Sequence, residues 1–315
     1  MGVFTLPPKQ PRADLDIESF LRSDSRKSPV RRFRRSLAAE WFPQSGVQLT
    51  WPHAATDWAP MLREVEETYI RLAFELSTRE TLLIVHPSPD EVRALLENRL
   101  PRRATDNIVY FACETDDTWA RDHAFLTVIG TGRPELLDFR FNGWGGKFGA
   151  EKDNAINRKL YDGGVLDGQY VDCLDFELEG GSVETDGMGT MLTTTRCLLN
   201  PNRGHAQEKP VVEARLCEAF GVSNILWLDH GAMAGDDTDM CPDRQIAYVK
   251  CDDTSDEHYD EFRLMEQQLA TFTDAEGASF QLVPLPLPSP IYEDGERLPA
   301  TYANYLVMNR AILMP

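Results

Sequence analysis

Several short segments of the sequence combine acidic residues with tryptophan or glycine, a combination suited to binding a cation. Residues 114–123 follow an apolar run and contain Trp119, Arg121 and Asp122. A carboxylate can pair with a cation, and an indole ring can stack on a flat one. Asp122 and Trp119 are therefore candidates for binding a planar cation. The alternative is that Arg121 bridges neighbouring acids and that Trp119 belongs to the core.

Two glycine-rich segments have less specific signals. Residues 141–147 place three glycines around a tryptophan, which indicates a tight loop with close backbone approach. We expect this loop to be a structural turn. In residues 178–187, Glu179 is followed by Gly180 and Gly181, which puts an acid beside accessible backbone amides. A hairpin loop without a binding role is the alternative for that segment.

An acidic segment is a candidate metal site. Asp236, Asp237 and Asp239 lie close together after an apolar run. Carboxylates in such an arrangement could bind Mg²⁺ or Ca²⁺. A solvated acidic loop is the preferred interpretation, and we expect no metal. A metal-dependent hydrolase built on these three residues is a rival hypothesis, which loss of activity with EDTA would favour.

Alternating apolar runs and amphipathic stretches must position these segments. The sequence predicts strands at residues 46–51, 81–86, 108–112, 123–129, 136–141, 190–199, 224–228, 245–250, 280–283 and 304–313. It predicts helices at residues 60–75, 88–98, 210–220 and 256–272. Ser88 and Glu91 have the spacing of a capping box at the start of the second helix. This order indicates a mixed α/β fold, and no glycine motif of a nucleotide-binding fold follows a strand.

Composition and charge exclude several classes of protein. The 315-residue chain has a net charge of −19, which argues against a nucleic-acid partner because phosphates need Lys and Arg. No run of about 18 apolar residues is present, so we expect no membrane partner. The start of the chain lacks the apolar region of a signal peptide. The six cysteines have no paired spacing, and we interpret them as reduced thiols of a cytoplasmic protein.

The first 36 residues differ from the rest of the chain. They are polar, contain four prolines and end in an arginine-rich run at residues 31–35. We expect residues 1–36 to be an N-terminal extension and residues 37–315 to form one domain. A functional basic arm is the alternative, because the run opposes the overall charge.

Six motifs, which follow one another in order from about residue 40 to the end, carry a resemblance to a known family. They are Trp41-Phe42-Pro43-Gln44-Ser45 with Leu49-Thr50-Trp51-Pro52 and Asp57-Trp58, Trp119-Ala120-Arg121-Asp122, Phe141-Asn142-Gly143-Trp144-Gly145, Glu179-Gly180-Gly181-Ser182, Gly235-Asp236-Asp237-Thr238-Asp239, and Ala303-Asn304-Tyr305-Leu306. Together they resemble the agmatine deiminase and bacterial-type (Porphyromonas-type) peptidylarginine deiminase family of the guanidine-modifying superfamily. The resemblance implies an α/β fold, a five-bladed propeller of ββαβ modules whose last module is incomplete in this sequence.

The resemblance also implies a reaction. A guanidinium is planar and poorly electrophilic, so its hydrolysis needs carboxylates to hold it, a thiolate to attack its carbon and a His to move protons. The implied course passes through a cysteine-linked thiouronium intermediate, without a metal or another cofactor. By the resemblance, Asp122 is the catalytic guanidinium-binding carboxylate. Trp119, Glu179, Asp239 and Asn304 are the implied substrate-binding residues, with Glu179 in a substrate or scaffold role.

The sequence departs from the family at two places. Family members have a His-x-Asp soon after the segment that ends here in Asp239, and a nucleophilic Cys beyond the segment that ends here at Pro315. We identify neither the nucleophile nor the general-base His, and Cys241, the cysteine near a motif, has no adjoining His. We favour the interpretation that the sequence joins pieces of a longer protein. The alternative is a catalytically silent guanidinium-binding protein.

The expected partner is a small cationic guanidino substrate. The motif at residues 141–145 resembles agmatine deiminases, which favours conversion of agmatine to N-carbamoylputrescine and ammonia, a step of polyamine biosynthesis. Deimination of peptidylarginine or arginine is the alternative, although we identify no recognition site for a peptide. The oligomeric state stays open, with a homodimer as one arrangement.

Overall fold

The computed structural model describes residues 35–204, 208–231, 238–241, 244–293 and 295–315, and at residues 238–241, 293 and 296 it describes the backbone alone. These residues form a mixed α/β fold, which confirms the predicted class. Among these residues, no helix has the length and apolarity needed to cross a bilayer.

Three consecutive units of the chain share one topology, in which two antiparallel strands are followed by a helix and by a strand parallel to the second. The helix makes this possible, because a parallel return needs a long crossover. The first unit consists of β5 (Leu126–Ile129), β6 (Glu135–Arg140), α7 (Glu151–Asp162) and β7 (Gln169–Glu177). Strand β1 (Ser36–Leu37) extends this sheet by pairing antiparallel with β5.

The second unit repeats this order with two extra short helical turns. Its elements are β8 (Val183–Thr185), β9 (Thr190–Thr194), α8 (Thr195–Leu198), the 3₁₀ helix η3 (Pro201–Arg203), α9 (Lys209–Phe220) and β10 (Asn224–Leu228). Strand β9 is antiparallel to β8 and parallel to β10. Gly221 ends α9 in the left-handed conformation, with φ +68°.

The third unit contains the acidic segment at its start. Its elements are β11 (Thr238–Cys241), β12 (Gln245–Lys250), α10 (Tyr259–Leu269) and β13 (Gln281–Pro286). Strand β12 is antiparallel to β11 and parallel to β13. In β11, Asp239 pairs with Ala247 and Met240 with Ile246.

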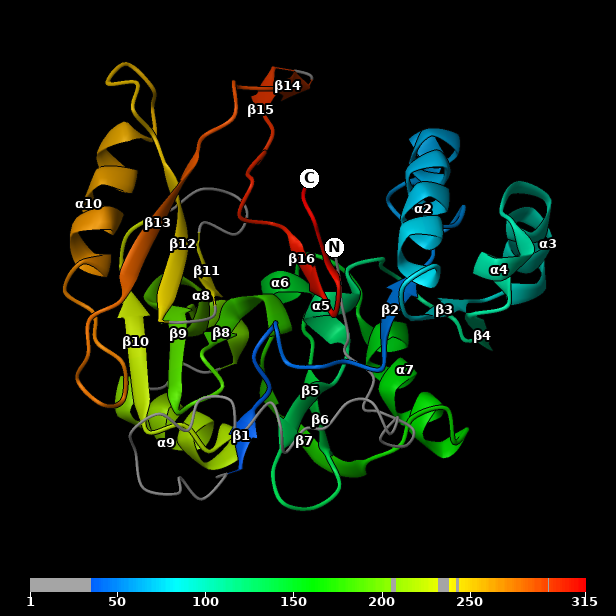
Figure 1. The fold of residues 1–315 in the computed structure, drawn as a ribbon, viewed down its shortest axis with the longest axis horizontal. Helices are drawn as coiled ribbons and strands as arrows, with labels where there is room; N and C mark the ends of the chain where they lie inside the picture. The colour runs from blue at the N-terminus through cyan, green and yellow to red at the C-terminus, as the bar shows by residue number, and fades with distance from the viewer. Residues whose placement is uncertain (1–34, 205–207, 232–237, 242–243, 294) are drawn as a thin grey trace.

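An all-parallel sheet precedes these units. It is formed by β2 (Gly46–Thr50), β3 (Thr81–His86) and β4 (Ile108–Ala112). Its connections contain η1 (Ala59–Met61), α2 (Leu62–Ser77), α3 (Pro89–Arg99) and α4 (Arg102–Thr105). In Figure 1, this sheet and the three units surround the short helices α5 (Ala120–His123) and α6 (Gly143–Gly146), which lie near the centre of the view.

Two hairpins end the described chain, β14 (Tyr292–Glu293) with β15 (Glu296–Arg297), and β16 (Leu306–Met308) with β17 (Ala311–Leu313). Leu306 and Met308 pack in the hydrophobic cluster formed by β2, β3, α2 and α3. The turn of the second hairpin is fixed there as well, because Asn309 Nδ2 donates to Gln44 O at 2.7 Å and Gln44 N donates to Asn309 Oδ1 at 2.9 Å. The last strands therefore return to the first sheet.

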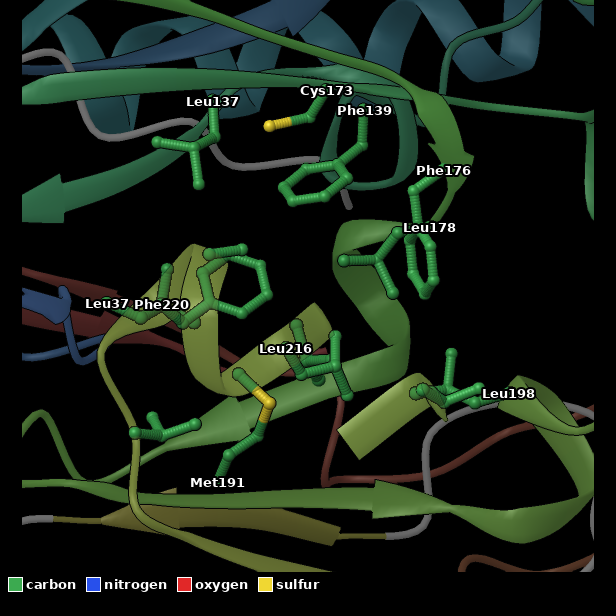
Figure 2. Packing of buried hydrophobic residues seen from close by; sticks show 14 of the residues in the cluster. Leu37, Leu137, Phe139, Cys173, Phe176, Leu178, Met191, Leu198, Leu216 and Phe220 are labelled. Atoms are coloured by element: carbon green, nitrogen blue, oxygen red, sulfur yellow. The ribbon is translucent and has the colours of Figure 1, made fainter. Parts of the chain in front are cut away.

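The first two units share a hydrophobic core (Figure 2). Leu137, Phe139 and Cys173 of the β5–β7 sheet face Leu216 and Phe220 of α9 across this core. Each such side chain, when fully buried, stabilises the fold by roughly 1.5–3 kcal/mol relative to leaving it exposed. This packing holds the first unit against the second, and the candidate site draws residues from both.

Several predicted elements differ from those observed. Helix α7 and strand β7 were not predicted. Helix α7 is a mostly polar segment with few apolar positions. The strand expected at residues 190–199 ends at Thr194, whose side chain accepts from Cys197 N and starts α8. The strand expected at residues 304–313 is a hairpin. The capping box at Ser88 was wrong, since its side chain makes no capping hydrogen bond.

Candidate active site

The segment that carries Trp119 and Asp122 is held by two carboxylates, of which that of Asp153 is buried. Asp153, in the first turn of α7, accepts hydrogen bonds at Oδ1 from the backbone N of Asp116 at 2.9 Å and of Asp117 at 3.2 Å. Asp117 in turn accepts from the backbone N of Trp119 at 3.1 Å, where α5 begins. Burial raises the pKa of Asp153 to about 7. These bonds fix the direction in which α5 presents Asp122.

Asp122 lies where three segments meet. Its Oδ1 accepts from the backbone N of Gly181 at 3.0 Å, and its Oδ2 accepts from the indole Nε1 of Trp144 at 3.3 Å. One donor comes from the segment after β7, and the other comes from the loop after β6. These two neutral donors help to orient the carboxylate plane.

The two glycines after Glu179 are required by the close approach of this segment to α5. A Cβ on Gly180 would lie 2.2 Å from the carbonyl oxygen of Arg121, and a Cβ on Gly181 would lie 2.6 Å from Asp122 Oδ1. Neither distance leaves room for a side chain. The two glycines of the Glu-Gly-Gly motif therefore allow a backbone N–H to reach the Asp122 carboxylate. A hairpin loop without a binding role would not require this close approach.

Trp144 reaches Asp122 from an unusual backbone conformation. It has φ +55°, and its glycine neighbours also have positive φ, with Asn142 Oδ1 accepting from Gly145 N at 2.7 Å across the turn. The indole packs edge-to-face against Phe141, with ring centroids 5.0 Å apart. Backbone conformations of this strained kind, with a non-glycine residue at positive φ, occur often at functional sites. The sequence predicted a structural turn here and missed the contact with Asp122, although three glycines around one tryptophan were a usable signal.

Glu179 is engaged by an arginine that sequence reasoning did not single out. Arg203 Nε donates to Glu179 Oε2 at 2.8 Å, and both side chains are buried. The hydrogen bond with Glu179, with the nearby charges of Cys197, Glu179 and Asp122, raises the pKa of Arg203 although burial opposes this. Glu179 Oε1 is buried and has no partner among the described residues. The contact supports the scaffold role for Glu179.

Arg121 bridges acids, as the alternative interpretation predicted, but the acids are remote in sequence. Its guanidinium contacts Glu40 and Glu184, the latter at 3.2 Å, and its Nε donates to the carbonyl of Gly180 at 3.1 Å. Trp119, by contrast, is 39% exposed and is not a core residue. Arg121 therefore fixes α5 to the glycine segment, while Trp119 is accessible to a ligand.

The remaining predicted site residues have less support. Asn304, just before β16, is half-buried and has no hydrogen-bond partner in the described part of the chain. Asp236 and Asp237 lie outside the described residues, and so does the side chain of Asp239. Among the described side chains, no group of three or more His, Cys, Asp or Glu could hold a metal ion. The structure thus brings Asp122 and Glu179 together, and it does not place Asp239.

Comparison with known proteins identifies the family. Residues 36–315 match the family of Porphyromonas-type peptidyl-arginine deiminases. The chain belongs to this family. The crystal structure of a Porphyromonas gingivalis protein is 42% identical, with a TM-score of 0.82 over 90% of this chain and 85% of that chain. Substrate-bound C. jejuni agmatine deiminase is 34% identical, with a TM-score of 0.80 over 92% of this chain and 85% of that chain.

A curated relative agrees with this assignment. The agmatine deiminase of Ectopseudomonas mendocina is 29% identical over 312 residues, which cover 89% of this chain and 82% of the relative. The match covers nearly the same share of this chain as the structural matches do. The sequence-based recognition of the agmatine deiminase and peptidyl-arginine deiminase family is confirmed.

In this deiminase-family chain, burial opposes a reactive role for four of the described cysteines and for His123. The free thiols of Cys113, Cys173, Cys217 and Cys251 have pKa values raised mainly by burial, which makes a poor nucleophile at neutral pH. His123 adjoins Asp122 in sequence, but it is fully buried, and this burial lowers its pKa to about 4.

Proposed function

We propose that this protein hydrolyses the guanidino group of a small cationic substrate, releasing ammonia and leaving a ureido product. The observation that carries the proposal is the Asp122 carboxylate, oriented by Gly181 N and Trp144 Nε1 and placed three residues after the exposed Trp119. A guanidinium offers paired N–H donors that match the two oxygens of a carboxylate. Its flat cationic face also suits stacking on an indole.

We propose agmatine as the substrate, with N-carbamoylputrescine as the product. The support is the resemblance of residues 141–145 to agmatine deiminases, together with relatives that carry this name. Peptidylarginine or free arginine is the second candidate, and the name of the matching family favours it. The two candidates differ in whether a carboxylate or peptide group must be accommodated beyond the alkyl chain.

The proposed chemical course uses a cysteine thiolate. Its sulfur forms a bond to the guanidino carbon, ammonia leaves with a proton supplied by a His, and water then displaces the sulfur from the thiouronium. By the family resemblance, the nucleophile and this His belong to segments that we do not identify in the 315-residue sequence. Should those groups be absent from the protein, the same carboxylate would make it a guanidinium-binding protein without turnover.

Three further properties are proposals of the same kind. The three repeated units and the parallel sheet are proposed to be blades of a five-bladed propeller, with Asp239 and Asn304 as additional substrate contacts. A cytoplasmic location is supported by the free cysteines at positions 113, 173, 197, 217 and 251. A homodimer and a place in polyamine biosynthesis follow from the resemblance.

Ammonia release and ligand binding test this proposal together. The protein is incubated with agmatine, arginine or an arginine peptide, and ammonia and ureido product are measured, with and without EDTA. Binding of agmatine is measured by calorimetry in the wild type, in Asp122→Asn and in the exposed control Asp162→Asn. We expect agmatine binding that Asp122→Asn weakens at least about 10-fold and that the control retains. Equal binding by Asp122→Asn would overturn the assignment, and EDTA-sensitive turnover would favour the metal-dependent rival.

A further inference from the structure

A second pocket lies apart from the Asp122 site, at the carboxyl ends of strands β2 and β3. Its volume is about 480 Å³, and helices α2 and α3 contribute its walls. Asp122, Trp119 and Glu179 are not among its lining residues. The carboxyl ends of parallel strands are where open α/β sheets commonly bind ligands.

Two N–H groups of the lining residues lack partners among the described residues, and one of them, the indole N–H of Trp51, is buried. His86 is 6% exposed, and its Nδ1 accepts from Ser88 N at 3.0 Å, so the neutral ring carries its proton on Nε2. No described residue accepts from that Nε2–H. The indole N–H of Trp51, which is fully buried, also has no partner among the described residues. A buried donor without an acceptor is costly, so the indole N–H of Trp51 favours a ligand that brings an acceptor.

A second histidine of the pocket is held neutral. His53 Nε2 lies 2.9 Å from Thr115 Oγ1, and its Nδ1 accepts from Ala55 N at 3.2 Å. Burial lowers the pKa of His53, and His86 and Lys152 lower it further. At neutral pH the ring therefore adds no positive charge that would repel a cation.

Carboxylates and apolar side chains complete the pocket. Glu66 of α2 and Glu91 of α3 line it, and neither forms an ion pair within the described ranges. Leu62, Val92 and Leu95 line it as well. Glu66 and Glu91 are more exposed than His86, which places the negative charge closer to solvent than the imidazole. No three of the described side chains are arranged to hold a metal ion, so an organic ligand is the better match.

We propose that this pocket binds an alkylammonium compound whose other end is a neutral hydrogen-bond acceptor, such as a ureido or amide group. The ammonium pairs with Glu66 and Glu91, the alkyl chain lies along the apolar side chains, and the acceptor oxygen takes the free N–H of His86. The product of the proposed reaction has this chemistry, but the inference rests on the pocket residues and not on turnover.

Three probes of the same chain length separate the contributions of the two ends. N-carbamoylputrescine carries both groups, butylammonium lacks the ureido group, and butylurea lacks the ammonium. In calorimetric titrations of the full chain, we expect butylammonium to bind about 2- to 10-fold more weakly than N-carbamoylputrescine, which is the contribution of a neutral hydrogen bond. We expect butylurea to bind at least about 10-fold more weakly, because a charge-assisted contact is lost.

Variants locate the binding. The double substitution Glu66→Gln with Glu91→Gln should weaken N-carbamoylputrescine at least about 10-fold and leave butylurea unchanged. Glu97→Gln is the matched control. Glu97 is an exposed acid on α3, the helix of Glu91, and its side chain does not line the pocket. The variant Asp122→Asn should keep this binding, so failure of the proposed reaction does not affect the result.

Imidazole nitrogen shifts report on the pocket directly. N-carbamoylputrescine should shift the Nε2 resonance of His86 and leave the ring of His258, which lies 3.2 Å from Asp256 Oδ1, unchanged. Three outcomes would overturn the proposal: no binding, binding that Asp122→Asn abolishes, or binding that the Glu66 and Glu91 substitutions leave intact.

Discussion

The buried carboxylate of Asp153 is expected to make the stability of the protein fall as the pH rises. Its side chain has no exposed surface, and its Oδ1 accepts from Asp116 N and Asp117 N. Burial is the largest cause that raises its pKa from 3.8 to about 7, and the charges of Asp116 and Asp117 add to it. The two backbone N–H groups act in the opposite direction and are outweighed.

The magnitude follows from the difference between the folded and unfolded pKa. Because the folded state binds this proton more tightly, its stabilising contribution is complete below the unfolded pKa of 3.8 and is lost as the pH rises through about 7. The whole difference corresponds to about 4 kcal/mol of unfolding free energy. About 2 kcal/mol of this loss falls between pH 5.5 and pH 8.

The variant Asp153→Asn isolates this contribution. The amide oxygen can still accept from the backbone of Asp116 and Asp117, but the side chain cannot ionise. Urea unfolding followed by circular dichroism at pH 5.5 and pH 8 should show the wild type losing about 2 kcal/mol more than the variant over this range. Asp162→Asn is the control, because Asp162 ends the same helix, is exposed and pairs with Arg158.

Equal pH dependence in the wild type and in Asp153→Asn would refute the reasoning. It would mean that the carboxyl is hydrated or that its two N–H donors hold it ionised in the folded state. The reasoning would also be refuted if the unfolding free energy of the wild type rose between pH 5.5 and pH 8 and that of the variant did not. The pH effect would then have the opposite sign. The control separates this effect from the general acidity of the chain.

Three substitutions test the contacts around Asp122. Gly181→Ala places a Cβ 2.6 Å from Asp122 Oδ1 and should weaken agmatine binding at least about 10-fold; unchanged affinity would contradict the packing argument. Trp144→Phe removes the indole N–H and should weaken the same binding about 2- to 10-fold while the melting temperature stays near that of the wild type. Glu179→Ala leaves Arg203 buried without its partner and should cost about 3–5 kcal/mol in urea unfolding; a loss below about 1 kcal/mol would show that Arg203 reaches water.

Much of the fold could be predicted because its strands are short apolar runs. The strands at residues 81–86, 108–112, 224–228 and 245–250 have the predicted bounds. Helix α7 escaped prediction, because its buried face includes Asp153 and Asn157 beside Ile156 and Leu160. Hydrophobic periodicity does not report a buried polar residue whose partner lies on another element. The three units share a topology without residue identity, so repeated modules were implied only by the family resemblance.

The sequence alone determined which residue types the candidate site contains, and the tertiary structure decided how they are used. Order and spacing of the motifs were sufficient to recognise the deiminase family and to select Asp122. Trp144 contacts Asp122 across 22 residues of chain, and Arg203 contacts Glu179 across 24. Asp153 contacts the backbone of residues 116 and 117 across 37 and 36 residues. Such contacts exist because the units pack around a common region, and no local pattern of side chains encodes that packing. For the same reason, the sequence offered Glu179 as a substrate-binding residue, whereas in the fold its carboxylate accepts a hydrogen bond from Arg203.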